Sequence, residues 1–529
     1  MDAEAKTKAG VKGSDVYTEV GVGDMRVALF QTLVRGLAQR DVRRFIRSAP
    51  EEHRTDLVVM AFQTRDIRGG KGERDLFYAM LDGLFVRWPE LVEKLVPLIP
   101  EYGCWKDLVK LLTYDFVDKT ITTKVIRATA SLVKEQFEKD KVAEHPSLLA
   151  KWLPREGSKM KLQAKYFAGI LFPDIADEND RFAAYRKAIA AINKKLKTTE
   201  ITMCGGEWAT LEPGHIPGKC MNVHRKAFLY QNIKAKKDPS NADRIACRDK
   251  FTEYLFNGGK VKGANTVYPH EITSKIQYTS KEEADLLNAQ WVSIREAAAT
   301  GGGLRKTVPM CDFSGSMNGT PFDVSLALGI LISEISSDAF KDHILTFDSV
   351  PHWVSFKDCA TLKEKIEEAT QYGHGLSTDF QAACDLILKR LVEYAVPPED
   401  APEDLLVFTD MGFDAACGSY GHVKKSEQWQ THCQMIRKSF ADAGYTMPRI
   451  VIWNLRAEYK DYHAQADEEG VLLLSGWSPV MLKALQGQGV KCATPYEGMR
   501  RILDDERYDL VRAAIESSSA AGRAGAGST

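Results

Sequence analysis

Hydrophobic residues in the first half of the chain recur every three or four positions, which is the period of one face of an α-helix. Such runs cover residues 25–37, 53–62 and 73–103, and short turns with glycine or proline separate them. Pro100 and Gly103 mark the end of one run, because both residues terminate helices. The pattern predicts a helical, repeat-like region over residues 25–300.

The hydrophobic pattern changes near Lys306 to short apolar runs that alternate with amphipathic segments. We predict strands at residues 307–311, 343–347, 352–356, 404–409, 449–454 and 471–474. A helix follows the first strand, with Thr320 as its N-cap and Pro321 at its first position. Strands that alternate with helices indicate a mainly parallel, doubly wound, Rossmann-like α/β sheet.

These patterns divide the chain into four predicted parts. We expect a flexible N-terminus over residues 1–24 and the helical domain over residues 25–300. The α/β domain covers residues 304–512, and residues 513–529, rich in serine, alanine and glycine, form a disordered tail.

Composition indicates an ordinary globular protein of the cell interior. Of the 529 residues, 44% are hydrophobic and 27% are charged, and no apolar run is long enough for a membrane span. The ten cysteines include no CxxC pair, which argues against a zinc ribbon or a disulfide scaffold. We therefore expect an intracellular protein of the cytoplasm, with the nucleus as the alternative location, and no membrane partner.

Polar residues lie in three of the predicted loops, two of which directly follow a strand. Asp312, Ser314 and Ser316 alternate after the first strand, Thr378 lies in a glycine-rich loop, and Asp410 follows the strand at 404–409. Ligand sites of parallel sheets lie at the carboxyl ends of the strands, so these side chains can converge. The first cluster alone is compatible with a divalent cation, an activated serine nucleophile, or a simple turn.

The same five residues, in this order and context, resemble the metal-ion-dependent adhesion site of von Willebrand factor A domains. The resemblance implies that Ser314 and Ser316 bind Mg²⁺ or Mn²⁺ directly, and that Thr378, Asp312 and Asp410 do so directly or through water. Hydroxyls are neutral oxygen ligands, so the ion keeps net positive charge. An open position would then accept an Asp or Glu of a protein partner.

Hydrolase chemistry is the main alternative at this cluster. Neither serine lies in a G-x-S-x-G motif, and His374 is the one nearby candidate for a base. Asp312 could also act as a phosphotransfer aspartate, although the second aspartate of the D-x-D pattern is replaced by Ser314. We therefore predict a protein that is not an enzyme.

The net charge of −1 hides a basic segment. Residues 181–270 contain 17 Lys and Arg against 7 Asp and Glu. A local basic surplus attracts phosphate-bearing ligands, although solvated helix faces often show the same composition. The candidate contacts to single-stranded or structured RNA are Arg225, Lys226, Lys234, Lys236 and Lys237.

The loop "DIRGGKGERD", residues 66–75, is a second candidate anion site. Its glycines, with Lys71 and Arg74, could expose backbone amides to a phosphate. The segment lacks the G-x-x-x-x-G-K-[ST] motif, and the same glycines suit a helix C-cap and turn. We favour the turn.

Over nearly its full length the chain resembles an uncharacterised protein family of plants, fungi, protists and large DNA viruses. The resemblance rests on "TRDIRGGKGERDLF", "LIPEYGCWKDL", "LKTTEITMCGGEW", "CMNVHRKAF", "DFSGSM", "VFTDMGFD" and "IVIWNLR". That family has a helical N-terminal region and a von Willebrand A-like domain. It is in turn similar to the HEAT-like TROVE module of Ro ribonucleoproteins, whose helices hold RNA.

Three functional interpretations follow. The first is a non-enzymatic scaffold whose A domain captures an acidic partner through a metal ion, and whose helical domain binds RNA within a ribonucleoprotein. The second is a structural or assembly protein with an unused metal site. The third is a metal-dependent hydrolase.

Overall fold

The computed structural model groups the chain into two compact units. One comprises Met1–Ala38, Pro217–Arg225 and Leu255–Asp504, and we call it the sheet unit; the other comprises Gln39–Ile216, Lys226–Tyr254 and Asp505–Thr529, and we call it the helical unit. The residues that the structure describes are all except 1–6, 10–14, 232–239, 264–265, 301–303, 305, 338, 348–349, 373–379, 412–434, 458–461, 486–493 and 517–529.

These units follow different boundaries from those predicted. Part of the segment expected to be flexible, residues 15–24, contacts the sheet unit, where Tyr17 N donates to Tyr462 O at 2.8 Å and Ala466 N donates to Val22 O at 2.8 Å. Residues 505–516, in contrast, group with the helical unit. The two units therefore interleave along the chain, because contacts between distant segments, and not sequence order, define them.

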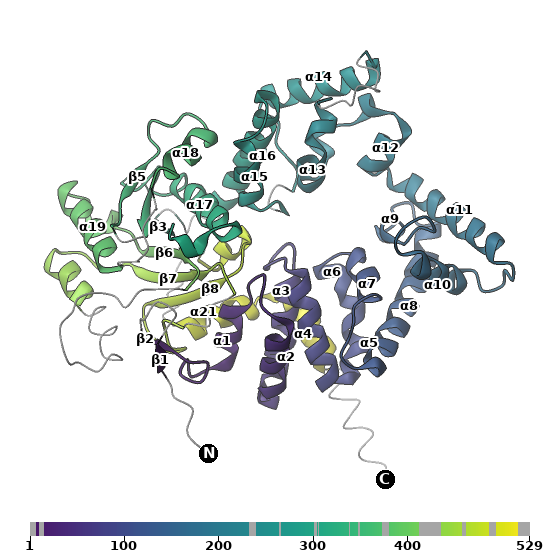
Figure 1. Ribbon diagram of the computed structural model, residues 1–529, viewed down its shortest axis with the longest axis horizontal. Coiled ribbons are helices and arrows are strands. Elements are labelled where there is room, and N and C mark those ends of the chain that lie inside the picture. Colours follow the sequence, from purple (N-terminus) through teal and green to yellow (C-terminus); the bar gives the residue numbers. More distant parts are fainter. Residues whose placement is uncertain are drawn as a thin grey trace, which may run out of the picture. The chain divides into compact units, whose positions relative to one another are not determined.

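The sheet unit is built on a six-stranded sheet in the order β5-β4-β3-β6-β7-β8 (Figure 1). All neighbouring strands are parallel except β4 and β5. The six predicted strands are confirmed, each to within one residue at either end. They are β3 (Thr307–Asp312), β4 (His343–Phe347), β5 (Trp353–Ser355), β6 (Asp404–Thr409), β7 (Arg449–Asn454) and β8 (Val471–Ser475).

Helices on the sheet unit come from several parts of the chain. They are α1 (Met25–Thr32), α15 (Pro269–Ile276), α16 (Lys281–Ala299), α17 (Thr320–Ser333), α18 (Leu362–Ala369), α19 (Phe380–Glu393) and α21 (Pro495–Leu503). α17 packs against β3 and α15, whereas α1 and α21 pack against β8. A two-stranded pair, β1 (Thr7–Ala9) and β2 (Asp15–Tyr17), precedes α1.

Helix α17 is buried along nearly its whole length, as its apolar sequence predicts. It begins one residue earlier than expected, because Gly319 occupies the cap position at a φ of +94° and Thr320, the predicted cap, is the first helical residue. Its packing against β3 is tight: a Cβ at Gly329 would lie 2.3 Å from Cys311 Sγ. Any side chain at position 329 would therefore push the helix away from the strand.

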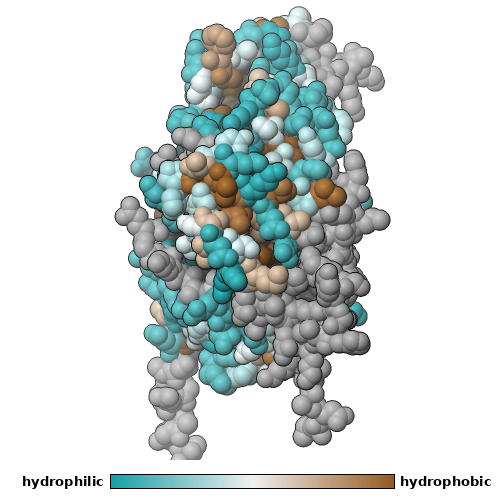
Figure 2. Space-filling model, turned by 90° about the vertical axis from the view of Figure 1, so that its left-hand side faces the viewer, coloured by the Kyte–Doolittle hydropathy of each residue, from teal (hydrophilic) through white to brown (hydrophobic). Residues whose placement is uncertain are grey.

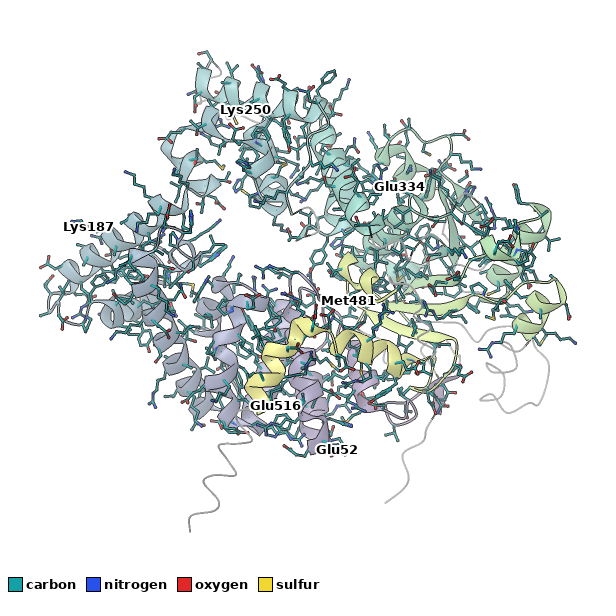
Figure 3. All side chains as sticks on the ribbon, turned by 180° about the vertical axis from the view of Figure 1, so that it is seen from behind. Glu52, Lys187, Lys250, Glu334, Met481 and Glu516 are labelled. Carbon is teal, nitrogen blue, oxygen red and sulfur yellow. The ribbon has the colours of Figure 1, made fainter. Side chains whose placement is uncertain are left out.

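Glu334, labelled in Figure 3, joins three helices at the C-terminal end of α17. Its carboxylate accepts hydrogen bonds from Trp291 Nε1 at 3.0 Å and from Lys365 Nζ at 2.9 Å. Because its side chain is 7% exposed, these charge-assisted bonds are needed to keep the carboxylate buried.

One face of the sheet unit, around α19, carries apolar side chains in contact with water. Val392 is 56% exposed and Tyr394 is 69% exposed. Figure 2 views this side and shows hydrophobic residues gathered among hydrophilic ones. Single exposed apolar residues are normal, so this face by itself indicates no function.

The helical unit confirms the prediction of a helical N-terminal region. It contains α2 (Gln39–Ser48), α3 (Arg54–Arg65), α4 (Arg74–Arg87), α5 (Val92–Leu95), α6 (Ile99–Tyr102), α7 (Trp105–Leu111), α8 (Lys119–Val142), α9 (Leu149–Trp152), α10 (Lys161–Leu171), α11 (Glu178–Leu196) and α12 (Thr199–Gly205). α13 (Gly218–Phe228) and α14 (Ala242–Phe256) each have residues in both units. The predicted run 73–103 is divided after α4, where Pro89, Pro97 and Pro100 interrupt regular helix.

Candidate metal site at the carboxyl edge of the sheet

The predicted site lies where the strand order reverses. β3 is the first strand of the sheet along the chain; β4 lies on one side of it and β6 on the other. Cys311 in β3 pairs with Phe408 in β6, so Asp312 and Thr409 end neighbouring parallel strands at the same edge, and Asp410 follows. Ligands of doubly wound sheets bind at such a reversal.

Asp312 is fully buried and held in one orientation. Its Oδ1 accepts a hydrogen bond from Ser314 N at 2.9 Å, and its Oδ2 accepts one from Thr409 Oγ1 at 2.9 Å. Each carboxylate oxygen has two lone pairs and can accept more than one hydrogen bond. Thr409 was not identified from the sequence, although its position beside Asp410 at the end of a strand was a usable signal.

The two serine hydroxyls lie together in the loop after β3. Ser314 caps the short 3₁₀ turn Gly315–Met317, and Ser314 Oγ lies 3.0 Å from Ser316 Oγ inside that turn. Ser314 is 2% exposed and Ser316 is partly exposed. The structure thus places two hydroxyls in the loop that directly follows Asp312.

The chain turns sharply after Asp410, which is also fully buried. Met411 has a φ of +72°, a conformation that costs a non-glycine residue about 1–2 kcal/mol. Two hydrogen bonds hold the turn: Met411 N donates to Thr409 Oγ1 at 3.2 Å, and His463 Nε2 lies 2.8 Å from Met411 O. Strain of this kind persists only where neighbouring groups enforce it, and it is concentrated at functional sites.

An arginine that follows strand β7 borders the serine loop. The Arg456 Nη1 group donates to Ser316 O, and the Arg456 backbone N donates to Asn454 Oδ1 at 2.9 Å. Asn454 is the last residue of β7 and is 1% exposed. Sequence reasoning missed both residues, because nothing in "IVIWNLR" alone shows that the end of β7 faces the loop after β3.

The remaining predicted ligand lies outside the described residues. Thr378 and the alternative base His374 both fall within residues 373–379. In the part of the chain that the structure describes, no three or more His, Cys, Asp or Glu side chains form a group that could hold a metal ion. The predicted set contains only two such side chains and otherwise consists of hydroxyls, a donor set that suits a hard cation.

The candidate RNA contacts are only partly described. Arg225 donates through Nε to Glu283 Oε2 at 2.9 Å and through Nη1 to Asn222 O at 3.0 Å, with 14% of its side chain exposed. Lys226 is exposed, and Lys234, Lys236 and Lys237 lie outside the described residues. Arg225 is therefore committed to internal bonds, and RNA binding stays a prediction.

The glycine loop near Lys71 uses its amides within the fold. Gly70 N donates to Asp66 O at 3.1 Å and Lys71 N donates to Gln63 O at 3.1 Å. A Cβ at Gly70 would lie 1.9 Å from Gln63 O, so glycine is required there for packing. Burial lowers the pKa of Lys71 to about 7, and the side chain is inaccessible. These contacts support the turn interpretation.

Comparisons with known proteins agree with part of the resemblance noted above. A family model described as a domain of unknown function, DUF7788, matches residues 306–514. Uncharacterized protein L728 of Acanthamoeba polyphaga mimivirus is 28% identical over 488 residues, which cover 88% of this chain and 82% of that protein. Among the described residues, no helix combines the length and apolarity that crossing a membrane requires. The chain is thus similar, over most of its length, to a protein of a large DNA virus.

Proposed function

We propose that this chain is a non-enzymatic interaction protein whose sheet unit binds Mg²⁺ or Mn²⁺ to capture an acidic partner. The observation that supports it most is that Asp312 with the paired serine hydroxyls, and Asp410, follow the adjacent parallel strands β3 and β6 at the reversal of the strand order. Their resemblance to the ion site of von Willebrand A domains points in the same direction. Thr378 would supply the fifth group.

The donor chemistry explains why such an ion would attract a partner. Ser314 and Ser316 would donate neutral hydroxyl oxygens, which leave positive charge of the ion available to an external carboxylate. A coordination position that faces solvent would be completed by water or by an external carboxylate, and Mg²⁺ keeps such positions readily. Hydrogen bonds from Ser314 N and Thr409 Oγ1 orient Asp312 in advance, which lowers the cost of ordering the site.

The described groups at this edge give little support to hydrolysis. The Ser314 hydroxyl lies 3.0 Å from the Ser316 hydroxyl. Among the described hydrogen bonds of these two hydroxyls, none is with a histidine, aspartate or glutamate side chain that could act as a base. Burial raises the pKa of the Cys311 thiol to about 12, which keeps it protonated and unreactive. We therefore favour binding over catalysis.

Calorimetric titration with MgCl₂ and MnCl₂ tests the ion site. Wild type should bind one ion, Ser316→Ala should weaken binding by about tenfold or more, and Asp312→Asn should abolish it. Asparagine keeps an oxygen that accepts from Ser314 N, so the fold should survive. Ser355→Ala, in β5 at the edge of the same sheet, is the matched control and should bind like wild type.

Partner capture is tested with the same four proteins. Each would be immobilised and exposed to a glutamate-rich peptide with Mn²⁺ or with EDTA. Retention should require the ion and should be lost in Asp312→Asn. If wild type binds neither ion by calorimetry, the serine loop is a structural turn and the proposal is wrong.

A further inference from the structure

A continuous series of hydrogen bonds links helix α1 to the serine loop of the candidate site. Asn454 Nδ2 donates to Gln31 O at 3.0 Å, near the C-terminal end of α1. Asn454 Oδ1 accepts from Arg456 N at 2.9 Å, and the guanidinium of Arg456 donates to Ser316 O. All of these residues belong to the sheet unit.

The orientation of the Asn454 amide follows from its neighbours. A backbone carbonyl can only accept and a backbone amide can only donate, so Nδ2 must face Gln31 O and Oδ1 must face Arg456 N. Asn454 is 1% exposed, so water cannot readily replace either bond. The side chain is therefore a rigid connector between a helix end and the residue that contacts Ser316.

The Gln31 side chain reaches the other half of the site. Its Nε2 lies 3.6 Å from Met411 Sδ, and Met411 N donates to Thr409 Oγ1, which donates to Asp312 Oδ2. Gln31 is 1% exposed. Gln31 thus belongs to two series of contacts. Its side chain contacts Met411, which is linked to Asp312 through Thr409, and its carbonyl contacts Asn454, which is linked to Ser316 through Arg456.

The neighbouring strand provides a comparison. Ser475, the last residue of β8, donates through Oγ to Phe30 O at 2.5 Å, so it also bonds a carbonyl near the end of α1. The carbonyls in the last turn of a helix have no partner inside the helix, and both strand-end side chains satisfy one of them. Among the described hydrogen bonds, the Asn454 bond continues to the serine loop through Arg456.

We infer that Asn454 is a positioning residue through which helix α1 sets the geometry of the serine loop. The N-terminal segment is then part of the ion site without touching the ion. The expected effect of Asn454 on ion binding rests on the proposed function. The coupling between α1 and the serine loop does not require an ion and can be measured in its absence.

Hydrogen exchange of the full chain without metal tests the coupling. Asn454→Asp cannot donate to Gln31 O but still accepts from Arg456 N, and Ser475→Ala removes the neighbouring bond to Phe30 O. Both variants should speed amide exchange in residues 25–32. Only Asn454→Asp should also speed exchange in residues 313–318, by about fivefold, the factor expected for one lost hydrogen bond.

A further variant and Mn²⁺ titration distinguish the positioning role of Asn454 from the proposed ion site. Arg456→Gln should speed exchange in residues 313–318 and leave α1 as in wild type, which keeps the test valid if Asn454→Asp fails to fold. If residues 313–318 exchange equally in wild type, Asn454→Asp and Arg456→Gln, the inference is wrong. If wild type binds no Mn²⁺ while the exchange differences are present, the ion proposal fails and the positioning role of Asn454 stands.

Discussion

At the scale of single residues, the ends of the central strands carry polar side chains that are fully buried. Thr409 Oγ1 accepts one hydrogen bond and donates another, and Asn454 does the same with its two amide atoms. A buried polar group that loses its partner costs about 1–3 kcal/mol. These positions therefore tolerate only substitutions that keep both donor and acceptor.

His270 leads to a prediction about pH. It lies between Tyr268 and Trp477, with ring centroids 5.5 Å from each, and it is 8% exposed. Burial lowers its pKa from 6.5 to about 4; Arg35, Lys219 and Lys275 act in the same direction, whereas Glu271 opposes them.

The unfolded chain takes up a proton at His270 near pH 6.5 and the folded chain only near pH 4. The contribution of neutral His270 to stability is therefore complete above pH 6.5 and is lost as the pH falls to about 4, by roughly 3 kcal/mol at most. Urea unfolding of wild type and His270→Gln at pH 7, 5.5 and 4.5 measures this loss. The advantage of wild type over the variant should shrink on acidification; a constant difference would contradict the assignment.

At the scale of elements, the chain returns after the sheet unit to pack on the helical unit. Residues 509–516 are helical, and Glu516, labelled in Figure 3, lies at the end of this segment. Just before it, Arg507 donates two hydrogen bonds to Asp66, which follows α3, and Tyr102 OH donates to Arg507 O at 2.7 Å. Part of the predicted tail, residues 513–516, is thus an ordered element of this unit.

Arg507→Ala should destabilise the helical unit substantially. Asp66 is fully buried, and removing one partner of a buried ion pair leaves a desolvated charge that costs about 3–5 kcal/mol. Chemical denaturation, with signals resolved for the two units by exchange or proteolysis, measures the change. Arg512→Ala is the matched control, because its carboxylate partner Asp509 is 69% exposed and such pairs contribute less than about 1 kcal/mol. Equal effects of both substitutions would show that the Asp66 pair is not a strong anchor.

At the scale of the whole molecule, the sheet of the sheet unit is covered by helices that lie far from its strands in sequence. α1 packs against β8, and α15 packs against α17. The family model matches residues 306–514 only, so α1, α15 and α16 lie outside it. A fragment limited to that range would expose the faces that these helices cover and would leave Asn454 and Ser475 without their acceptors.

We expect the isolated fragment 306–514 to melt at least about 10 °C below a fragment that joins residues 1–38 to 255–504 through a flexible linker. A shift of this size corresponds to a loss of about 3–5 kcal/mol in a unit of 150–250 residues. Scanning calorimetry of both fragments measures it. Equal melting temperatures would mean that α1, α15 and α16 are dispensable for the fold of the sheet.

The sequence alone determined the local elements and the chemistry at the strand ends. Alternation of apolar runs with amphipathic helices located all six strands of the sheet, because burial on both faces of a parallel sheet leaves a continuous hydrophobic signal. Asp312, Ser314, Ser316 and Asp410 were predicted as ion ligands because ligand sites follow such strands; the structure places them after the neighbouring strands β3 and β6, and ion binding stays a prediction.

Only the tertiary structure decided which distant segments of the chain meet. Gln31 meets Asn454 across 423 positions, and Arg507 meets Asp66 across 441. Periodicity reports which face of an element is buried, but it carries no information about what covers that face. The partners of buried polar groups are chosen by the fold as a whole, because each must be satisfied by whichever donor or acceptor the packed chain brings within hydrogen-bonding distance.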